Sequence, residues 1–172
     1  PRWAGASLKY ERSLVVTVIF ITSVERTSWK YSTRREMLTA MGHYGQALDY
    51  IRPEVNKMQA HRAKVLNNLS RVLSELGWNG LGVCMDGRDL RWELAEEVPL
   101  ASSYNTLALI YDDMGRYEDA PLLSAKAIAY CRRAAESRQL VLSLRQMAES
   151  LRHLADRWRA RQRLAVTADA YY

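Results

Sequence analysis

The chain has few of the residues on which several classes of protein depend. Among its 172 residues there are two cysteines, Cys84 and Cys131, and they lack the CxxC or Cys/His spacing of a metal site. Two isolated cysteines exclude a disulfide-rich scaffold, and we expect both to be buried reduced thiols, as in a cytosolic protein. One phenylalanine stands against ten tyrosines and five tryptophans, so most of the aromatic side chains carry a polar group.

A hydrophobic run long enough to cross a bilayer is also missing. The apolar run at residues 14–21 is too short for that, and no cleavage pattern follows it that would make it a signal peptide. Its β-branched residues favour a strand, whereas its place before a repeated helical pattern favours a helix, and we expect the helix. We therefore expect no membrane segment here.

Residues suited to catalysis do not form a recognisable pattern. His43, His61 and His153 lie far apart in the sequence, and the glycine-rich residues 77–82 lack the Lys-Ser/Thr ending of a phosphate-binding loop. The acidic pair at 112–113 is typical of a solvated helix. We expect no catalytic residues, no cofactor and no metal, and hence a protein that is not an enzyme.

What the chain does contain is one helical pattern repeated in register. Gly42, Gly77, Gly115 and Ala155 follow one another at intervals of 35, 38 and 40 residues. An apolar residue directly precedes each of them, and further apolar residues stand four and eleven positions before. This spacing keeps one face of a helix apolar, so it predicts helical hairpins that turn at these four positions.

Small residues recur at fixed distances from the four predicted turns. Seven residues before the turn or five residues after it stand Ser70, Ala108, Ala148, Ala47, Gly82, Ala120 and Ala160. Small side chains let two helices approach closely where they cross. Glycine at the turn itself suits a left-handed cap, a conformation that residues with a Cβ resist. The pattern therefore predicts an all-α fold with close helix crossings.

The third copy of the pattern resembles the tetratricopeptide repeat (TPR) family most closely. It carries that family's motif residues at Tyr104, Leu107, Ala108, Tyr111, Gly115, Tyr117, Ala120, Ala127 and Ile128. The resemblance covers residues 28–168 and implies a right-handed α-solenoid of about four hairpins, with 1–27 as a degenerate preceding repeat and 169–172 as a tail. The intervals exceed the usual ~34 residues and in this resemble the repeats of a longer-repeat subgroup, which includes kinesin light chains and bacterial signalling regulators.

Some positions depart from the pattern. Two arginines at 34–35 stand where the first copy should pack, so we expect its first helix to be irregular or to start late. Pro53 should kink or end the helix that follows the first turn. Gly80, Gly82 and Gly87 would each cost about 1 kcal/mol against alanine in a helix interior. We therefore expect the second helix of the second copy to be the loosest element.

Polar side chains off the packing stripe predict a binding groove, because the resemblance implies that the first helix of each hairpin lines a concave face. The predicted groove residues are Lys64, Asn67, Asn68, Arg71, Glu75, Asn105, Leu109, Asp112, Arg145 and Arg152. Asn67 and Asn105 occupy equivalent positions, and their amides can both donate to and accept from a peptide backbone. The alternative is that Asn67 only satisfies a neighbouring helix. We expect a protein- or peptide-binding scaffold, without the Lys/Asn/Arg set that binds chaperone tails.

The net charge of +6 comes largely from arginines near the end of the chain. This end is either a nucleic-acid-binding surface or a solvated face whose charges pair with Glu149 and Asp156. We favour the solvated face, because RNA-binding repeat codes and base-stacking motifs are absent. The resemblance to bacterial regulators implies a cytoplasmic interaction segment of a larger signalling or regulatory protein, with other domains in the same chain.

Overall fold

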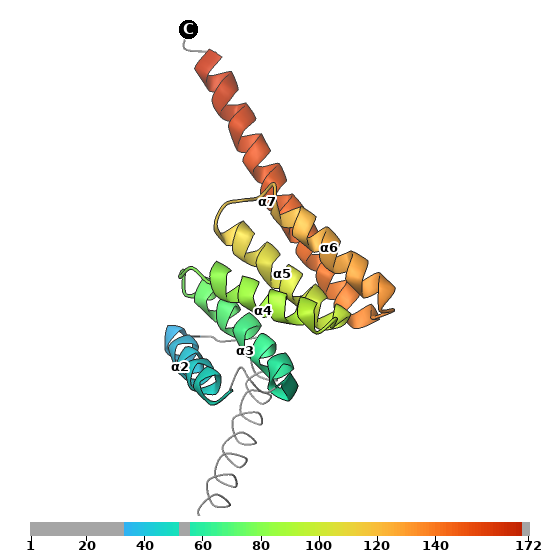
Figure 1. The fold of residues 1–172 in the computed structure, drawn as a ribbon. Helices are drawn as coiled ribbons and strands as arrows, with labels where there is room; N and C mark the ends of the chain where they lie inside the picture. The colour runs from blue at the N-terminus through green and yellow to red at the C-terminus, as the bar shows by residue number, and fades with distance from the viewer. Residues whose placement is uncertain (1–32, 52–55, 170–172) are drawn as a thin grey trace, which may run out of the picture. The chain divides into compact units, whose positions relative to one another are not determined.

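A computed structural model describes residues 33–51 and 56–169, and Figure 1 shows their helices in chain order. The helices are α2 (Arg34–Tyr50), α3 (Asn56–Glu75), α4 (Leu81–Glu93), α5 (Glu97–Asp113), α6 (Ala120–Arg133) and α7 (Ser137–Asp169). The described residues contain no strand, and the predicted all-α, TPR-like fold is confirmed. The predictions for residues 1–27, including the run at 14–21, and for Pro53 concern residues outside those described. The chain divides into two compact parts, residues 1–90 and 91–172.

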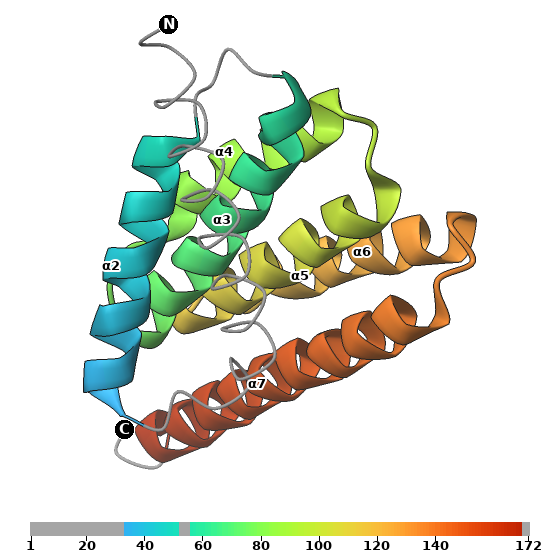
Figure 2. The same cartoon turned by 90° about the horizontal axis from the view of Figure 1, so that it is seen from below.

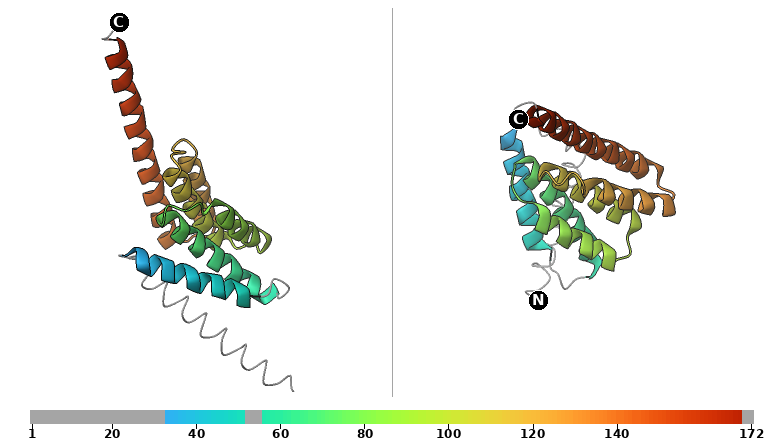
Figure 3. Two further views of the ribbon diagram at one scale, coloured as in Figure 1. Left: turned by 90° about the vertical axis from the view of Figure 1, so that its left-hand side faces the viewer. Right: turned by 90° about the horizontal axis from the view of Figure 1, so that it is seen from above.

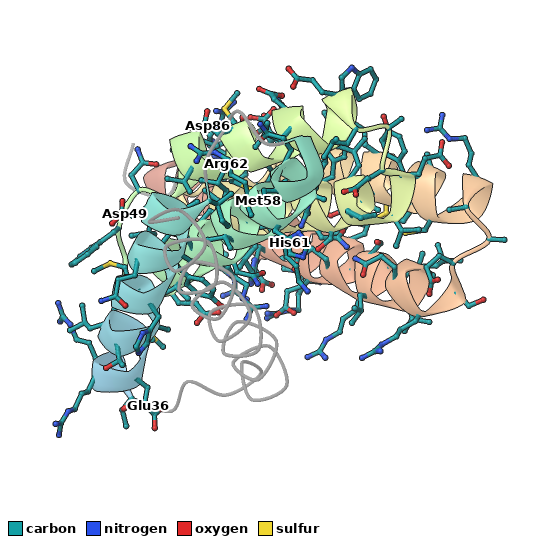
Figure 4. The ribbon with its side chains drawn as sticks, turned by 60° about the horizontal axis from the view of Figure 1, so that its bottom comes forward. Glu36, Asp49, Met58, His61, Arg62 and Asp86 are labelled. Atoms are coloured by element: carbon teal, nitrogen blue, oxygen red, sulfur yellow. The ribbon has the colours of Figure 1, made fainter. Side chains whose placement is uncertain are left out.

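In the first part, α2 begins at Arg34 because Thr33 caps it. The Thr33 side chain accepts a hydrogen bond from the backbone N–H of Glu36, and the Glu36 carboxylate accepts one from the backbone N–H of Thr33. This capping box satisfies two backbone donors that a helix start leaves without partners. Figure 4 shows Glu36 at this start and Asp49 near the other end of α2.

The predicted turn at Gly42 is wrong, because α2 continues through this residue to Tyr50. The physical reason is an apolar stripe that crosses the glycine without a break. Ala40, Tyr44, Ala47 and Ile51 are all at least 95% buried and share one helix face. A turn at Gly42 would separate the two halves of this stripe, so the buried area stabilises one straight helix instead.

The core of the first part lies between α2 and α3. Val65 and Val72 of α3 pack in one cluster with the buried stripe of α2. At the end of α2, the backbone carbonyl of Ile51 accepts a 3.5 Å hydrogen bond from the guanidinium of Arg62, which Figure 4 labels on α3. Cys84 of α4 is completely buried in the same part.

The predicted turn at Gly77 is confirmed, but the packing residue after it differs from the prediction. Gly82 is exposed with open space around it, whereas Gly80 lies directly against the backbone of Ser70. Gly87, seven residues further, lies against Ala63 and Leu66 of α3, where an added Cβ would be 3.1 Å from the nearest atoms. Two of the three glycines therefore permit the close approach of α3 and α4, so packing explains their presence without a loose helix.

In the second part, α5 and α6 form the predicted hairpin with its turn at Gly115. The two small residues expected at the crossing, Ala108 and Ala120, are both completely buried. Nearby, the rings of Tyr104 and Tyr130 stack with their centroids 5.6 Å apart. This part therefore shows the helix pair that the third copy of the sequence pattern predicts.

The predicted turn at Ala155 is wrong, because α7 continues through it as one helix of 33 residues. Figures 2 and 3 show α7 lying along α5 and α6 and then extending beyond them. Alanine has the highest helix propensity, and here it replaces the glycine that the other turns place in a left-handed conformation. The fourth copy therefore provides a first helix whose continuation does not fold back, and Ala160, the predicted crossing residue, is exposed.

Four helix ends share one capping geometry, and sequence inspection located two of them. At each end a residue with positive φ donates to a carbonyl three residues back, and the next residue donates to one five back, as in a Schellman motif. The four positive-φ residues are Gly77, Ala95, Gly115 and Ala135. The alanine ends join one hairpin to the next helix, and the sequence pattern did not reveal them because alanine rarely adopts this conformation.

A reciprocal exchange at two of these ends should change stability in opposite directions. Gly115→Ala places a Cβ at φ 75° and should destabilise the protein by about 1 kcal/mol, whereas Ala135→Gly removes one at φ 52° and should stabilise it by a similar amount. Urea unfolding followed by circular dichroism measures both. Equal midpoints for both variants and the parent would contradict the assigned helix ends.

Candidate functional site

Polar side chains join α5 to α7, the first helices of the third and fourth copies. The Asn105 amide donates a 2.8 Å hydrogen bond to the hydroxyl of Ser143. That hydroxyl in turn donates to the backbone carbonyl of Gln139 at 2.9 Å, and the Cys131 sulfur lies 3.6 Å from it. Asn105 therefore has its amide directed at a neighbouring helix within the array.

Asp112 forms the second link between these helices, seven residues after Asn105 on α5. Its Oδ2 atom accepts hydrogen bonds from the Ser150 hydroxyl at 2.6 Å and from the Gln146 amide at 3.2 Å. The residue is 5% exposed, and burial, as the largest cause, raises the pKa of its carboxyl group. The Ser150 hydrogen bond and the nearby His153 act in the opposite direction, whereas Asp113 and Glu149 raise the pKa further.

Serine, aspartate and histidine meet here, but not in the order that activates a nucleophile. The His153 Nδ1 atom is 3.9 Å from the Asp112 carboxylate, and the Ser150 hydroxyl donates to that same carboxylate. In a hydrolytic triad the histidine lies between the other two and accepts the serine proton. The His153 ring also packs edge-on against Tyr117, with centroids 5.8 Å apart. The arrangement is suited to holding two helices together.

The other predicted groove residues of the second part are more accessible than Asp112. Leu109 is half-buried, while Arg145 and Arg152 are exposed. Arg152 forms a 3.3 Å ion pair with Glu149 on the same helix. Accessible apolar and charged side chains thus remain on the first helices beside the polar links.

In the first part, the predicted groove residues all lie on α3. Asn67 is 5% exposed, and its side-chain oxygen has no hydrogen-bond partner among the described residues. Lys64, Asn68 and Arg71 are half-buried, and Arg71 forms a 3.4 Å ion pair with the exposed Glu75. The groove function of these residues stays a prediction.

Sequence reasoning missed the residues that complete the polar links. Ser143 and Ser150 are completely buried and stand seven residues apart on α7, which places them on one helix face. Arg91 is also buried, and its guanidinium donates to the Pro99 carbonyl at 2.6 Å and to the Ser103 hydroxyl at 2.7 Å. Short polar residues at helical spacing on an otherwise apolar face were the available signal.

The arginines near the end of the chain are exposed, as a solvated face requires. The predicted pairing with Glu149 and Asp156 is confirmed, since Arg152 contacts both and Arg159 lies 3.1 Å from Asp156. Arg157 additionally donates a 2.8 Å hydrogen bond to the backbone carbonyl of Gly115. Some of these arginine side chains are therefore fixed by ion pairs or hydrogen bonds to other residues of the chain.

Three further properties bear on function. Cys84 and Cys131 are buried and not joined by a disulfide, as predicted. Within residues 33–51 and 56–169, no three His, Cys, Asp or Glu side chains come together as a metal site would need. None of the helices in these ranges combines the length and the apolarity that crossing a membrane requires.

The raised pKa of Asp112 predicts a pH dependence of stability. A carboxyl group with a higher pKa in the folded than in the unfolded state stabilises the fold at low pH, and this stabilisation is lost as the pH rises through the folded-state pKa. Asp112→Asn removes the titrating group and keeps an oxygen that can accept from Ser150. We expect the free energy of unfolding of this variant, relative to the parent, to rise between pH 4 and pH 7.

Asp113→Asn is the matched control, because the same chemical change then falls on an exposed neighbour. Urea titrations at a series of pH values measure both variants. If the free energies of unfolding of Asp112→Asn and Asp113→Asn both run parallel to that of the parent over the whole pH range, burial of the Asp112 carboxylate is not a determinant of stability.

Comparison with known proteins finds a family model to which the central repeat is similar. The family model described as "Tetratricopeptide repeat" matches residues 100–145, which span nearly all of α5, all of α6 and the start of α7. Neither a curated protein nor a solved structure matches the chain. The matched range contains the Gly115 turn and the completely buried Ala108 and Ala120. The family match and the helix arrangement agree, so residues 100–145 are similar to a tetratricopeptide repeat.

Proposed function

We propose that this chain is a scaffold that binds a protein or peptide segment along the first helices of its repeats. The observation that carries the proposal is the tetratricopeptide match over residues 100–145, because repeats of this family generally mediate protein–protein interaction and are not catalytic. Supporting it, the residues that join α5 to α7 leave Leu109, Arg145 and Arg152 accessible. A half-buried apolar residue among charged ones can anchor a peptide and exclude water around it.

The test must use residues whose removal leaves the fold intact. Asn67 and Asp112 are buried, so their replacement would mix binding with stability. Asn68 and Leu109 are half-buried, and both belong to the predicted groove. The double variant Asn68→Ala, Leu109→Ala is therefore the informative one, and Arg159→Ala with Arg163→Ala is its counterpart at the arginine-rich end.

The probe is a peptide selected on the full chain from a random-sequence library, compared with single-stranded homopolymer RNA. We expect the peptide to lose affinity for the Asn68/Leu109 variant, to bind the Arg159/Arg163 variant like the parent, and to depend weakly on salt. The opposite pattern would support the nucleic-acid alternative: RNA binding that falls steeply with salt and is lost in the arginine variant.

The setting in which such a scaffold acts is also part of the proposal. The turns at Gly77 and Gly115 are 38 residues apart, above the usual ~34, and this spacing resembles that of the longer-repeat subgroup that includes kinesin light chains and bacterial signalling regulators. On that basis we infer a cytoplasmic interaction segment of a signalling or regulatory protein that has further domains in the same chain. Identification of the coding sequence on either side of this segment tests this inference directly.

A further inference from the structure

The helices α5 and α7 are equivalent, and a comparison of the two reveals an uncovered face. Residues of α7 correspond to those of α5 forty positions earlier, so that Ser143 matches Ser103 and Ala148 matches Ala108. On α5, Ala101 and Ala108 are completely buried and Tyr104 is 9% exposed, in the hairpin with α6. The face of α5 that carries these residues is therefore a helix-binding face.

The same face of α7 is apolar and exposed. Its residues, which we call the α7 stripe, are Val141, Leu144, Ala148, Leu151, Ala155 and Trp158. They alternate at spacings of three and four, so they form one continuous line along the helix. Val141 is 64% exposed, Leu144 46%, Leu151 45% and Trp158 55%. Contiguous apolar surface of this kind on a folded protein marks an interaction site.

A row of arginines runs beside the α7 stripe. Arg138, Arg145, Arg152 and Arg159 stand seven residues apart and are all exposed. Three of them follow a stripe residue by four positions, as Arg145 follows Val141, so they lie next to it on the helix surface. The whole of α7 contains seven arginines against three acidic residues. A partner that covers the stripe therefore meets a positive flank.

We infer that the α7 stripe and its arginine row bind an amphipathic helix with acidic flanks from a partner protein, in the place on α7 that α6 occupies on α5. A helix is the expected shape, because the equivalent face of α5 is covered by one. Acidic flanks are expected, because carboxylates would pair with the arginine row. Exposed ion pairs such as Arg159–Asp156 contribute little to the stability of the fold. These arginines can therefore leave a carboxylate of their own chain and pair with a carboxylate of the partner.

Two other occupants are disfavoured by charge. The chain's own residues 156–169 continue α7, and folding them back would bring Arg157, Arg161 and Arg163 towards the arginine row. A second copy could pack its α7 antiparallel against this one, stripe against stripe. In that arrangement the arginine rows of both helices lie on the same side of the helix pair, next to each other. Two rows of positive charge that lie next to each other repel. An acidic partner removes this repulsion.

The probe is a designed helical peptide of about 24 residues, with leucine at the first and fourth positions of each heptad and glutamate beside them. One control peptide has the same composition in scrambled order, and another replaces glutamate by lysine. We expect the full chain to bind the first peptide and neither control. Equal binding of the scrambled peptide would show a non-specific charge effect, and failure of the first peptide to bind would overturn the inference.

Variants then locate the site. Leu144→Ser with Leu151→Ser removes the centre of the stripe without a change of charge, and we expect the affinity to fall about tenfold or more. Leu122→Ser is the matched control, because Leu122 is 65% exposed and belongs to α6 instead of the α7 stripe. Circular dichroism checks that helicity is kept. Equal loss in the control would overturn the inference, as would a dimer of the chain alone that Leu144→Ser with Leu151→Ser dissociates.

The α7 stripe shares no residue with the predicted groove, although Arg145 and Arg152 of the arginine row also belong to the groove, so binding at the stripe and binding at the groove can fail separately. The Asn68/Leu109 variant leaves the α7 stripe intact, so it should bind the acidic peptide like the parent. A loss of acidic-peptide binding in that variant would assign the peptide to the groove and contradict a second surface.

Discussion

Gly80→Ala should be among the most damaging single substitutions in the first part of the chain, at about 3 kcal/mol. A Cβ at this position would lie well inside the van der Waals distance of the Ser70 carbonyl oxygen. The position of Cβ is fixed by the backbone of residue 80, and the oxygen belongs to the backbone of Ser70, so no side-chain rotation can relieve the overlap and α4 would have to move away from α3. Urea unfolding followed by circular dichroism measures the loss.

Gly82→Ala provides the control two residues further on. Nothing lies within 4 Å of a Cβ built there, and the residue is inside a helix, so alanine should be neutral or stabilise by up to about 1 kcal/mol. If Gly82→Ala were the damaging change and Gly80→Ala the neutral one, the register between α3 and α4 would be the one that the sequence pattern predicts.

The fold class was predictable because several kinds of signal agreed in the central repeat. Around Gly115, apolar spacing, the left-handed cap and the two small residues at the crossing all indicate the same hairpin. The structure and the family match both contain it. Gly77 was predictable for the same reason, although the next helix begins four residues after Gly77 and five residues after Gly115, and the packing glycine is Gly80 instead of Gly82.

The turns at Gly42 and Ala155 could not be judged from local sequence. A glycine after an apolar residue is compatible with a helix end and with a helix interior, where it costs only about 1 kcal/mol. The decision depends on what each flanking segment packs against. For α2, Tyr44 and Ala47 continue the buried stripe that starts at Ala40, and this packing extends the helix beyond the glycine.

The polar links between α5 and α7 show why the groove residues were harder to predict than the fold. Helical periodicity correctly placed Asn105 and Asp112 off the stripe that faces α6. It could not distinguish a side chain that lines a groove from one that contacts the next first helix, because both lie on neighbouring parts of the same surface. Their partners, Ser143 and Ser150, are distant in sequence, and serine has no strong pattern of its own.

The equivalence of α5 and α7 leads to the second large prediction, that the same substitution has opposite consequences on the two helices. Ala108 and Ala120 are both completely buried at the α5–α6 crossing. A leucine at either position overfills this crossing, so Ala108→Leu and Ala120→Leu should each destabilise the protein by about 1–3 kcal/mol. The two effects should not add in the double variant, because after one leucine has forced the helices apart the second finds more room.

Ala148→Leu is the control that isolates packing from the chemical change, since Ala148 is the α7 equivalent of Ala108 and is exposed. Its substitution should leave the urea midpoint of the chain within the range of surface changes, about 0.5 kcal/mol. The same variant should nevertheless weaken binding of the acidic helical peptide, because a small residue at this position permits close approach of the second helix. A destabilised Ala148→Leu variant would mean that another segment already covers the α7 stripe, and then the face would be part of the folded chain instead of a surface for a partner.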